Sequence, residues 1–474
     1  MRFAVFGDFM KKKVVFIVIY VLLCLVPLAT IPFSKDTSAA EKRTLSAFPK
    51  AVNEGKPNLS FFTEFDAWFS DHMGGRSYLV EAQTMMKEYV FRESAESSVI
   101  LGSNGWLFYE KTAQDFSKVA TLTERNTRNI AVTLRMMQDY CTERDVDFVF
   151  TVAPNKNTLY PDNMPAWYVV TSGKSNLDML TADLDRFGVN YADLRAAFAR
   201  EQKVLYQARD SHWTYEGGML AYRVIVNKMK KQHNLYDGVT FTERADWDAD
   251  LANMLYPNAP DNDVQAYPDL EYSFEVKGFF GGDEDLVIET TGGAGEGSLL
   301  MFRDSFGNTT WRYFADAFAD ADFERAVPYR LNTIDRVDID TVVLEIVERN
   351  IGNLAEKAPM MEAPKRTVEV LDAYDISDLN NRIESRETGV FLHLYGSVDP
   401  GVLGENYHVY IIVKNNGITE FYEAFPIFER ELLGEERCCD NGFSCYLPEE
   451  VKGAESIGIL TESNGRLFYM PFTK

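Results

Sequence analysis

The stretch Leu299-Leu300-Met301-Phe302-Arg303-Asp304-Ser305-Phe306-Gly307-Asn308 decides the fold class, because an apolar strand runs into a turn and then towards a helix. The helix is predicted from Trp311 to Phe318. This order presents the hydroxyl of Ser305 at the carboxyl end of a strand, where backbone N–H groups of the following helix N-terminus are available to an oxyanion. Ser305 is therefore the candidate nucleophile of the chain.

Strands and helices alternate on both sides of this stretch. Helices are predicted over residues 123–144 and 175–186, and strands over residues 147–152, 189–194 and 341–347. Strands that alternate with helices at this spacing are typical of an α/β domain with three layers and a mostly parallel sheet. Ligands bind such sheets at the loops that follow the strands, so the candidate nucleophile lies where a site is expected.

A candidate base lies in the stretch Asp210-Ser211-His212-Trp213-Thr214, in a loop just ahead of an amphipathic run that predicts another helix. Asp210 precedes His212 by two residues and can orient and polarise its imidazole. The other histidines fall in helical or β-rich surroundings away from strand-end loops; they are His72, His233, His393 and His408. If the three residues meet, His212 takes the proton of Ser305 and Asp210 fixes the tautomer of His212. Ser305 then attacks an acyl carbonyl.

Four further residues complete the candidate site. Backbone N–H groups near Ser305 and Gly307, helped by the side-chain amides of Asn308 or Asn155, could stabilise a tetrahedral oxyanion. Trp213 has two interpretations, because its ring could stack on a sugar or pack in the core. Aspartate, serine and histidine are common residues, so an incidental arrangement without catalysis is the alternative interpretation of the whole set.

The N-terminal residues predict a membrane anchor. Residues 1–13 include Arg2, Lys11, Lys12 and Lys13, and residues 14–33 contain no charged side chain. About twenty apolar residues suffice to span a bilayer, and the basic cluster keeps the amino end in the cytoplasm. We therefore expect a single-pass protein of the cell membrane with its main domains outside the cytoplasm. A signal peptide cleaved near Ser38-Ala39-Ala40 is the alternative.

The remaining chain predicts a linker and two domains. Residues 34–58 are polar with scattered prolines and predict a tether, and residues 59–365 hold the α/β domain. Residues 241–297 break its rhythm and predict an insertion that either roofs the site or decorates the surface. Residues 366–474 show alternating strands and tight turns, which predict a C-terminal β-sandwich.

Composition excludes some classes of partner. The 474 residues carry a net charge of -24, so the surface repels polyanions on average and no nucleic acid partner is expected. An anionic polymer could bind only through a local basic groove. Cys438, Cys439 and Cys445 could hold one disulfide or remain plain thiols. Without an adjacent histidine they do not complete a tetrahedral zinc site, and we expect neither a metal nor a cofactor.

These motifs together resemble the SGNH-hydrolase-like proteins of the AlgX/AlgJ alginate O-acetylation type and the related family named for its D-H-H-W motif. The resemblance covers about residues 41–365 and rests on the order and spacing of several stretches. They are Glu41-Lys42-Arg43-Thr44-Leu45, Asp71-His72 with Arg76, Gly105-Trp106-Leu107-Phe108-Tyr109, Ala153-Pro154-Asn155-Lys156 with Tyr160-Pro161, Asp210-Ser211-His212-Trp213-Thr214, and Arg303-Asp304-Ser305-Phe306-Gly307.

The resemblance implies an SGNH-like fold and a triad of Asp210, His212 and Ser305. Ser211 stands where the D-H-H-W motif has its first histidine, which leaves the acid and the base in place. The implied activity is O-acetylation of an extracytoplasmic polysaccharide. Because cytosolic acetyl-CoA cannot reach that side, a membrane-bound acyltransferase is expected as the partner that supplies acetyl groups. By analogy, the β-sandwich is a possible carbohydrate-binding module.

Two alternatives stay open. A carbohydrate acetylesterase would use the same triad and would release acetate without a glycan acceptor. A non-catalytic polysaccharide-binding or assembly protein would not form an acyl-enzyme. The acidic composition also disfavours a uronic-acid polymer, so alginate itself is not expected as the substrate.

Overall fold

The computed structural model describes most of the chain after residue 43. The described ranges are 13–18, 37–38, 43–53, 56–73, 76–256, 262–369, 373–375, 381–404, 406–428 and 440–472, with single residues between 20 and 31. The predicted membrane segment at residues 14–33 and the linker at residues 34–58 therefore lie partly outside the described residues. None of the helices within these described ranges is long and apolar enough to cross a bilayer.

The chain folds into two compact units, which are described separately. The first consists of Met1–Glu110, Ala208–Ser211 and Ala245–Val264. Its helices are α2 (Phe61–His72), α3 (Arg76–Met86) and α10 (Asp250–Leu255), and its hairpin pairs β5 (Val99–Leu101) with β6 (Leu107–Tyr109). A small core joins the hairpin to α10 through Val99, Leu107, Leu251 and Leu255.

The helical segment between Phe61 and Phe91 is interrupted. Met73 has an extended conformation with ψ 120°, which ends α2, and a π-helical turn (Lys87–Phe91) follows α3. The aromatic side chains of α2 contact one another, and Phe62 is 83% exposed.

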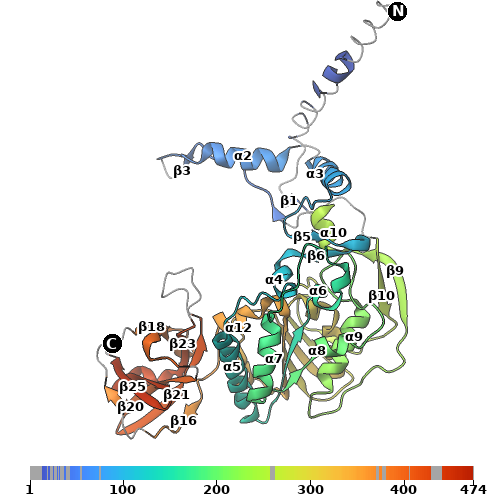
Figure 1. The fold of residues 1–474 in the computed structure, drawn as a ribbon. Helices are drawn as coiled ribbons and strands as arrows, with labels where there is room; N and C mark the ends of the chain where they lie inside the picture. The colour runs from blue at the N-terminus through green and yellow to red at the C-terminus, as the bar shows by residue number, and fades with distance from the viewer. Residues whose placement is uncertain are drawn as a thin grey trace, which may run out of the picture. The chain divides into compact units, whose positions relative to one another are not determined.

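The second unit is built on a seven-stranded mixed sheet (Figure 1). Five of its strands are parallel: β14 (Asp320–Glu324), β13 (Ser298–Phe302), β15 (Thr341–Val347), β7 (Asp147–Ala153) and β8 (Tyr191–Ala192), in this spatial order. The register places Leu299 opposite Thr341 and Thr341 opposite Asp147. The carboxyl ends of β13, β15 and β7 therefore share one edge, as the sequence predicted.

Helices cover both faces of this sheet. Side chains alternate along β13, so Leu300 and Phe302 lie on one face while Leu299 and Met301 lie on the other. The first face packs against α5 (Glu124–Thr142), α7 (Asn176–Phe187) and α12 (Gly352–Glu356). The second packs against α8 (Leu194–Phe198), α9 (Tyr215–Val226) and α11 (Trp311–Ala317). The predicted mostly parallel α/β domain is confirmed.

Local signals explain why the two long helices were predictable. The Thr123 side chain accepts a hydrogen bond from the Asn126 backbone and begins α5, and Ser175 does the same with Asp178 at the start of α7. Gly188 has φ 64° and ends α7, a left-handed conformation that favours glycine.

The two halves of the segment predicted as an insertion belong to different sheets. β9 (Phe241–Trp247) and β10 (Asp263–Pro268) form a separate two-stranded sheet. β11 (Glu275–Val276) and β12 (Val287–Thr291) instead extend the central sheet, because β12 pairs antiparallel with β14. The second half of the segment therefore belongs to the central sheet, and the assignment of residues 241–297 as an insertion stays a prediction.

The C-terminal residues form two facing sheets in the same unit. One contains β16 (Lys365–Arg366), β21 (Ile418–Glu423), β20 (Tyr407–Asn415), β24 (Ser456–Ser463), β25 (Arg466–Phe472) and β17 (Ala373–Asp375); the other contains β18 (Arg382–Glu387), β19 (Phe391–Ser397), β23 (Gly442–Pro448) and β22 (Phe425–Ile427). The two sheets enclose a common core, which is the arrangement of a β-sandwich. All pairings are antiparallel except that of β17 with β25.

Two details of the sandwich test the sequence predictions. Asn416 and Gly417 have φ 50° and 77°, which is the turn chemistry expected for the hairpin between β20 and β21. Cys445 is a buried free thiol on β23, so it forms no disulfide. Cys438 and Cys439 lie outside the described residues.

The sandwich and the α/β domain share one hydrophobic core. Phe425, Ile427 and Phe428 belong to the same buried cluster as the apolar face of α5. The Nδ2 atom of Asn129 on α5 also donates to the Tyr407 hydroxyl at 3.0 Å. The two parts therefore form one packed body within the second unit.

Candidate functional site

Ser305 lies in a short 3-10 helix (Ser305–Thr309) directly after β13. Asp304 holds this turn, because its Oδ1 accepts from the Phe306 backbone at 2.9 Å and its Oδ2 accepts from the Val347 backbone at 2.7 Å. Val347 is the last residue of β15, so one carboxylate fastens the serine turn to the neighbouring strand. The sequence predicted the turn but not this hydrogen bond, since Val347 is distant along the chain.

The structure brings His212 to Ser305. The Nε2 atom of His212 is 2.9 Å from the Oγ of Ser305, although the residues are 93 positions apart. The backbone carbonyl of His212 accepts from Gln207 at 3.1 Å, and the side chain of Thr214 caps α9 by accepting from Gly217 at 3.1 Å. His212 is therefore held from both sides of its loop, as a positioned base requires.

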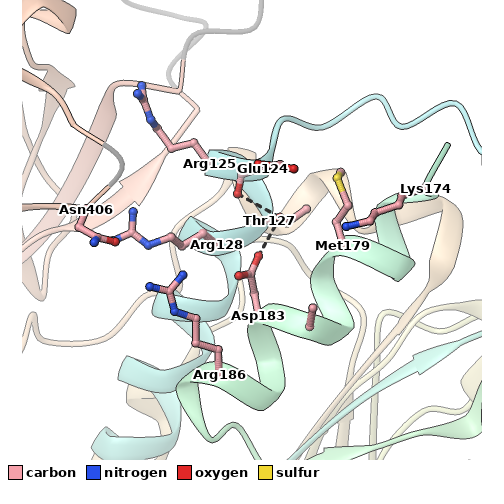
Figure 2. A pocket seen from close by; sticks show the side chains of 10 residues that line it. Glu124, Arg125, Thr127, Arg128, Lys174, Met179, Asp183, Arg186 and Asn406 are labelled. Atoms are coloured by element: carbon pink, nitrogen blue, oxygen red, sulfur yellow. Dashed lines mark hydrogen bonds between the residues drawn. The ribbon is translucent and has the colours of Figure 1, made fainter.

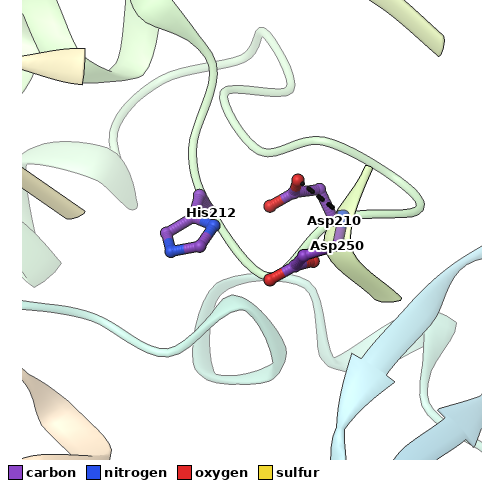
Figure 3. Close-up of side chains that lie close together, drawn as sticks. All are labelled: Asp210, His212 and Asp250. Carbon is purple, nitrogen blue, oxygen red and sulfur yellow. Dashed lines mark hydrogen bonds between the residues drawn. The ribbon is translucent and has the colours of Figure 1, made fainter. Parts of the chain in front are cut away.

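Asp210 belongs to the first unit and is 2% exposed. Its Oδ2 accepts a hydrogen bond from the Trp247 indole at 3.1 Å. The same oxygen accepts from the Asp250 backbone at 3.0 Å (Figure 3). Ser211 donates to the Asp250 carboxylate through its backbone N–H and its hydroxyl. Trp247 and Asp250 were not predicted, because they lie in the segment taken for an insertion. The pairing of Asp210 with His212 stays a prediction.

Trp213 is a core residue and does not offer a platform for a sugar ring. Its side chain is 1% exposed, stacks on Phe198 at 5.5 Å and meets Phe306 edge-on at 4.9 Å. Its indole N–H donates to the hydroxyl of Thr309. Of its two interpretations, packing in the core is the one that this environment supports, because the aromatic cluster beneath Ser305 already surrounds the ring.

Gly218 lets α9 approach the serine turn closely. A Cβ atom at this position would lie 2.7 Å from the hydroxyl oxygen of Thr309 and 3.1 Å from its Cβ. Thr309 is the last residue of the 3-10 helix that begins at Ser305. Helix and turn therefore fit together only without a side chain at residue 218.

Gly307 and Asn308 use their hydrogen-bonding groups inside the protein. The N–H of Gly307 donates to the Asp304 carbonyl at 3.2 Å. The Asn308 amide accepts from Arg303 Nη1 at 2.6 Å and donates to Glu284 Oε1 at 2.6 Å. Both residues support the serine turn, and a direct part in oxyanion binding stays a prediction.

Arg303 forms a buried clamp that sequence reasoning missed. It is 2% exposed, and its Nη2 donates to the Asp283 carbonyl at 2.9 Å while its Nη1 bonds Asn308. Burial, followed by the charge of Arg325, lowers the pKa of Arg303 to about 10. The clamp ties the segment before β12 to the serine turn.

Asn155 follows β7 at the same sheet edge and is 1% exposed. Its backbone N–H donates to Glu348 Oε2 at 2.8 Å, and its Nδ2 donates to Asp115 Oδ2 at 3.2 Å. Burial raises the pKa of both acids, that of Glu348 to about 7 with help from the charge of Asp115, and that of Asp115 to about 6. These acids were not predicted; the position of Glu348 directly after β15 was the available signal.

The described residues contain another close histidine–serine pair, with the opposite hydrogen-bond direction. In the sandwich, His393 Nε2 is 2.7 Å from Ser444 Oγ, and Arg386 Nε donates to His393 Nδ1 at 3.1 Å. Because arginine has no acceptor, Nδ1 must accept, and the ring proton must lie on Nε2. His393 therefore donates to Ser444 and cannot activate it. Burial and then the charge of Arg386 lower the pKa of His393 to about 4.

Comparison with known families supports the resemblance. Residues 99–267 match the family model described as SGNH hydrolase-like domain, acetyltransferase AlgX. The match contains Asp210 and His212 and ends before Ser305. It confirms the predicted resemblance and the predicted class of enzyme, an acetyltransferase of the SGNH hydrolase type.

Several solved structures are similar to the chain. A DHHW family protein from Eubacterium siraeum is 15% identical with a TM-score of 0.40, and the similarity covers 50% of this chain and 90% of that one. PatB1 from Bacillus cereus is 15% identical with a TM-score of 0.41 over 53% of this chain and 96% of its own. AlgX from Pseudomonas aeruginosa is 11% identical with a TM-score of 0.35 over 79% and 91%. At these values the likeness carries no argument about function. Among curated proteins, none matches the chain.

Proposed function

We propose, from the match of residues 99–267 to the SGNH hydrolase-like acetyltransferase AlgX model, that the chain O-acetylates a cell-surface or secreted polysaccharide. The observation that carries the proposal is the 2.9 Å contact between His212 Nε2 and Ser305 Oγ at the carboxyl end of β13. A serine needs an adjacent base to become a nucleophile at neutral pH, and this contact supplies one.

The reaction has two halves. His212 accepts the hydroxyl proton of Ser305 while Oγ attacks the carbonyl carbon of an acetyl donor, and the donor leaves with the proton returned by His212. A sugar hydroxyl then attacks the carbonyl carbon of acetyl-Ser305 and gives its proton to His212. The new sugar ester forms, and Oγ of Ser305 leaves with the proton that His212 returns. Asp210 fixes the His212 tautomer with the proton on Nδ1, which leaves Nε2 free to accept.

Two groups are the best candidates for the oxyanion site. The Phe306 and Gly307 backbone N–H groups already donate to Asp304. The backbone N–H of Ser305 and the side-chain amide of Asn155 are therefore assigned to the developing negative charge. Asp115 accepts from Nδ2 of Asn155 at 3.2 Å and so orients this amide.

The partners follow from the location. We place the domains outside the cytoplasm, behind an anchor at residues 14–33. Acetyl groups then come from a membrane-bound acyltransferase, and the acceptor is a glycan at the cell surface. The β-sandwich is assigned to glycan binding.

The test follows acetyl transfer from p-nitrophenyl acetate to a panel of neutral oligosaccharides by the detergent-solubilised full-length protein. Release of p-nitrophenol and the mass of each sugar are measured for the wild type, Ser305→Ala and the matched control Ser444→Ala. Acetylated sugar that depends on Ser305 and not on Ser444 supports the transferase.

Other outcomes point to the alternatives. Release of acetate that depends on Ser305, without acetylated sugar, favours a carbohydrate acetylesterase. Equal behaviour of the wild type and Ser305→Ala contradicts the proposal and favours a polysaccharide-binding or assembly protein.

A further inference from the structure

A cavity of about 330 Å³ lies against α5 and α7, beside the start of the sandwich strand β20 (Figure 2). Small-molecule sites in proteins begin at about this size, roughly 300 Å³. Its lining comes from the first turns of α5, from α7 and the residue before its cap, and from the loop before β20: Glu124, Arg125, Thr127, Arg128, Lys174, Met179, Ala182, Asp183, Arg186 and Asn406. All of these residues belong to the second unit.

Arg128 is the unusual member of this lining. Its side chain is 8% exposed, yet Nε and Nη1 have no hydrogen-bond acceptor among the residues that the structure describes. A buried charge without partners costs free energy, so proteins normally pair it. Burial, followed by the charge of Arg186, lowers the pKa of Arg128 below its ordinary value. The side chain is therefore held where it gains from an added anion.

The acids of the cavity do not neutralise Arg128. Asp183 accepts from the Thr127 hydroxyl at 2.9 Å, and Glu124 is an exposed residue at the start of α5. Arg125 has its own acceptor, since its Nη1 lies 3.0 Å from Asp440. Figure 2 shows the guanidinium groups of Arg128 and Arg186 extending towards the side of the cavity where Asn406 lies.

Four cationic side chains and two acidic ones line the cavity, in a chain whose net charge is -24. Such a local excess of positive charge attracts anions despite the acidic surface. Guanidinium groups are suited to carboxylate and phosphate oxygens, which supply several acceptors at once.

We infer that this cavity is a binding site for the oxyanion group, carboxylate or phosphate, of a small ligand. The anion pairs with the guanidinium group of Arg128, Arg186 adds a second positive charge, and the amide of Asn406 donates from the sandwich side. A bound ligand thus contacts both the α/β domain and the sandwich. The site is independent of Ser305 and of the proposed acetyl transfer.

The test titrates the full-length protein with sodium phosphate, sodium glucuronate and neutral glucose, at constant ionic strength adjusted with sodium chloride. Thermal unfolding and calorimetry report binding. For the wild type we expect phosphate or glucuronate, and not glucose, to raise Tm by about 2 to 4 °C at saturating concentrations. Phosphate alone would identify a phosphate ligand, and glucuronate alone an acidic sugar; both support the site.

Arg128→Gln is expected to bind the same anion at least about tenfold more weakly, because the buried donor is lost. The matched control is Arg135→Gln on the same helix, where Arg135 pairs with Asp139 outside the cavity. If Arg128→Gln does not fold, Arg186→Gln provides the comparison, with a smaller loss expected. The inference is overturned if no anion binds the wild type, or if all variants respond to anions alike.

Discussion

At the scale of the residue, the hydrogen bonds of two histidines separate a candidate base from a structural one. His393 must carry its proton on Nε2, because Arg386 donates to Nδ1, and so it donates to Ser444. For His212 the proposed reaction requires the opposite direction, with Nε2 accepting from the Oγ of Ser305 at 2.9 Å. Proximity of serine and histidine is therefore a weaker criterion than the direction of the bond.

This difference predicts opposite results for two substitutions. His212→Ala should lower kcat for acetyl transfer at least about a thousandfold, because Ser305 loses its base. His393→Ala should leave kcat per folded molecule within about twofold while lowering stability, since it unpairs the buried hydroxyl of Ser444. Steady-state kinetics with p-nitrophenyl acetate, corrected for the folded fraction, distinguish them. Comparable losses of kcat in both variants would contradict the assignment of the base.

Glu348 gives a prediction about pH. Burial and the charge of Asp115 raise its pKa to about 7, above the ordinary value of 4.5. The folded protein thus holds this proton more tightly than the unfolded chain, so the stability from this group is present at low pH and is lost as the pH rises from about 4.5 to about 7. The change amounts to about 3 kcal/mol for a fully buried group.

Glu348→Gln should remove part of the dependence of the unfolding free energy on pH, because glutamine is neutral at every pH and keeps a carbonyl acceptor for Asn155. Urea unfolding between pH 4.5 and pH 7.5 measures it, at roughly 1.4 kcal/mol per unit of pKa shift. Glu143→Gln is the control, with an exposed side chain at the end of α5. An unchanged slope in Glu348→Gln would show that other acids, such as Asp115, account for it.

The sequence predicted the chemistry of single residues only where a local motif carries it. Ser305 follows an apolar strand and His212 precedes a helix, so both were found. Contacts with segments far along the chain determine the roles of Asp304, Arg303 and Glu348. No local sequence pattern predicts such contacts. The sequence left two interpretations of Trp213 open, because it cannot show that an aromatic cluster encloses the ring.

At the scale of the element, the contact of α9 with the serine turn is set by the absence of a side chain. Gly218→Ala would place Cβ 2.7 Å from the Thr309 hydroxyl oxygen, so the turn that carries Ser305 must move. We expect a loss of about 1 to 3 kcal/mol in the free energy of unfolding, together with a lower kcat.

A second helical glycine provides the control. At Gly352, the first residue of α12, an added Cβ meets nothing within 4 Å. Gly352→Ala should therefore be neutral or stabilise the protein by up to about 1 kcal/mol through helix propensity. Denaturant unfolding and kinetics of the two variants check the pair. If both behave alike, the close fit of α9 against the turn is not what Gly218 provides.

Elements with strong local signals were predicted well, and the others were not. Helices α5 and α7 have side-chain caps and apolar periodicity, and β7 and β15 are buried throughout. β14 was not predicted, because its acidic residues Asp320, Asp322 and Glu324 are not typical of a strand in a central sheet. Strand pairing supplies the stability that its composition lacks, so only the fold reveals it.

At the scale of the whole molecule, the shared core between α5 and the sandwich predicts that the second unit unfolds cooperatively. Phe425 is 0% exposed and packs with Phe428 in the cluster that contains the apolar face of α5. If the sandwich folded independently, a substitution within it would leave the α/β domain unchanged.

The tryptophans make this testable, because all six precede the sandwich, and Trp213 and Trp311 are buried in the α/β domain. Phe425→Ala should lower the denaturant midpoint of the tryptophan fluorescence by the equivalent of about 3 to 5 kcal/mol, the usual effect of truncating a buried phenylalanine. Ile418→Ala, with a side chain 65% exposed on the same sandwich, should leave that midpoint unchanged. If Phe425→Ala leaves the fluorescence midpoint unchanged, the two parts fold separately, and the core they share does not couple their stabilities. If the midpoint does move, a ligand that binds beside α5 and Asn406 stabilises both parts together.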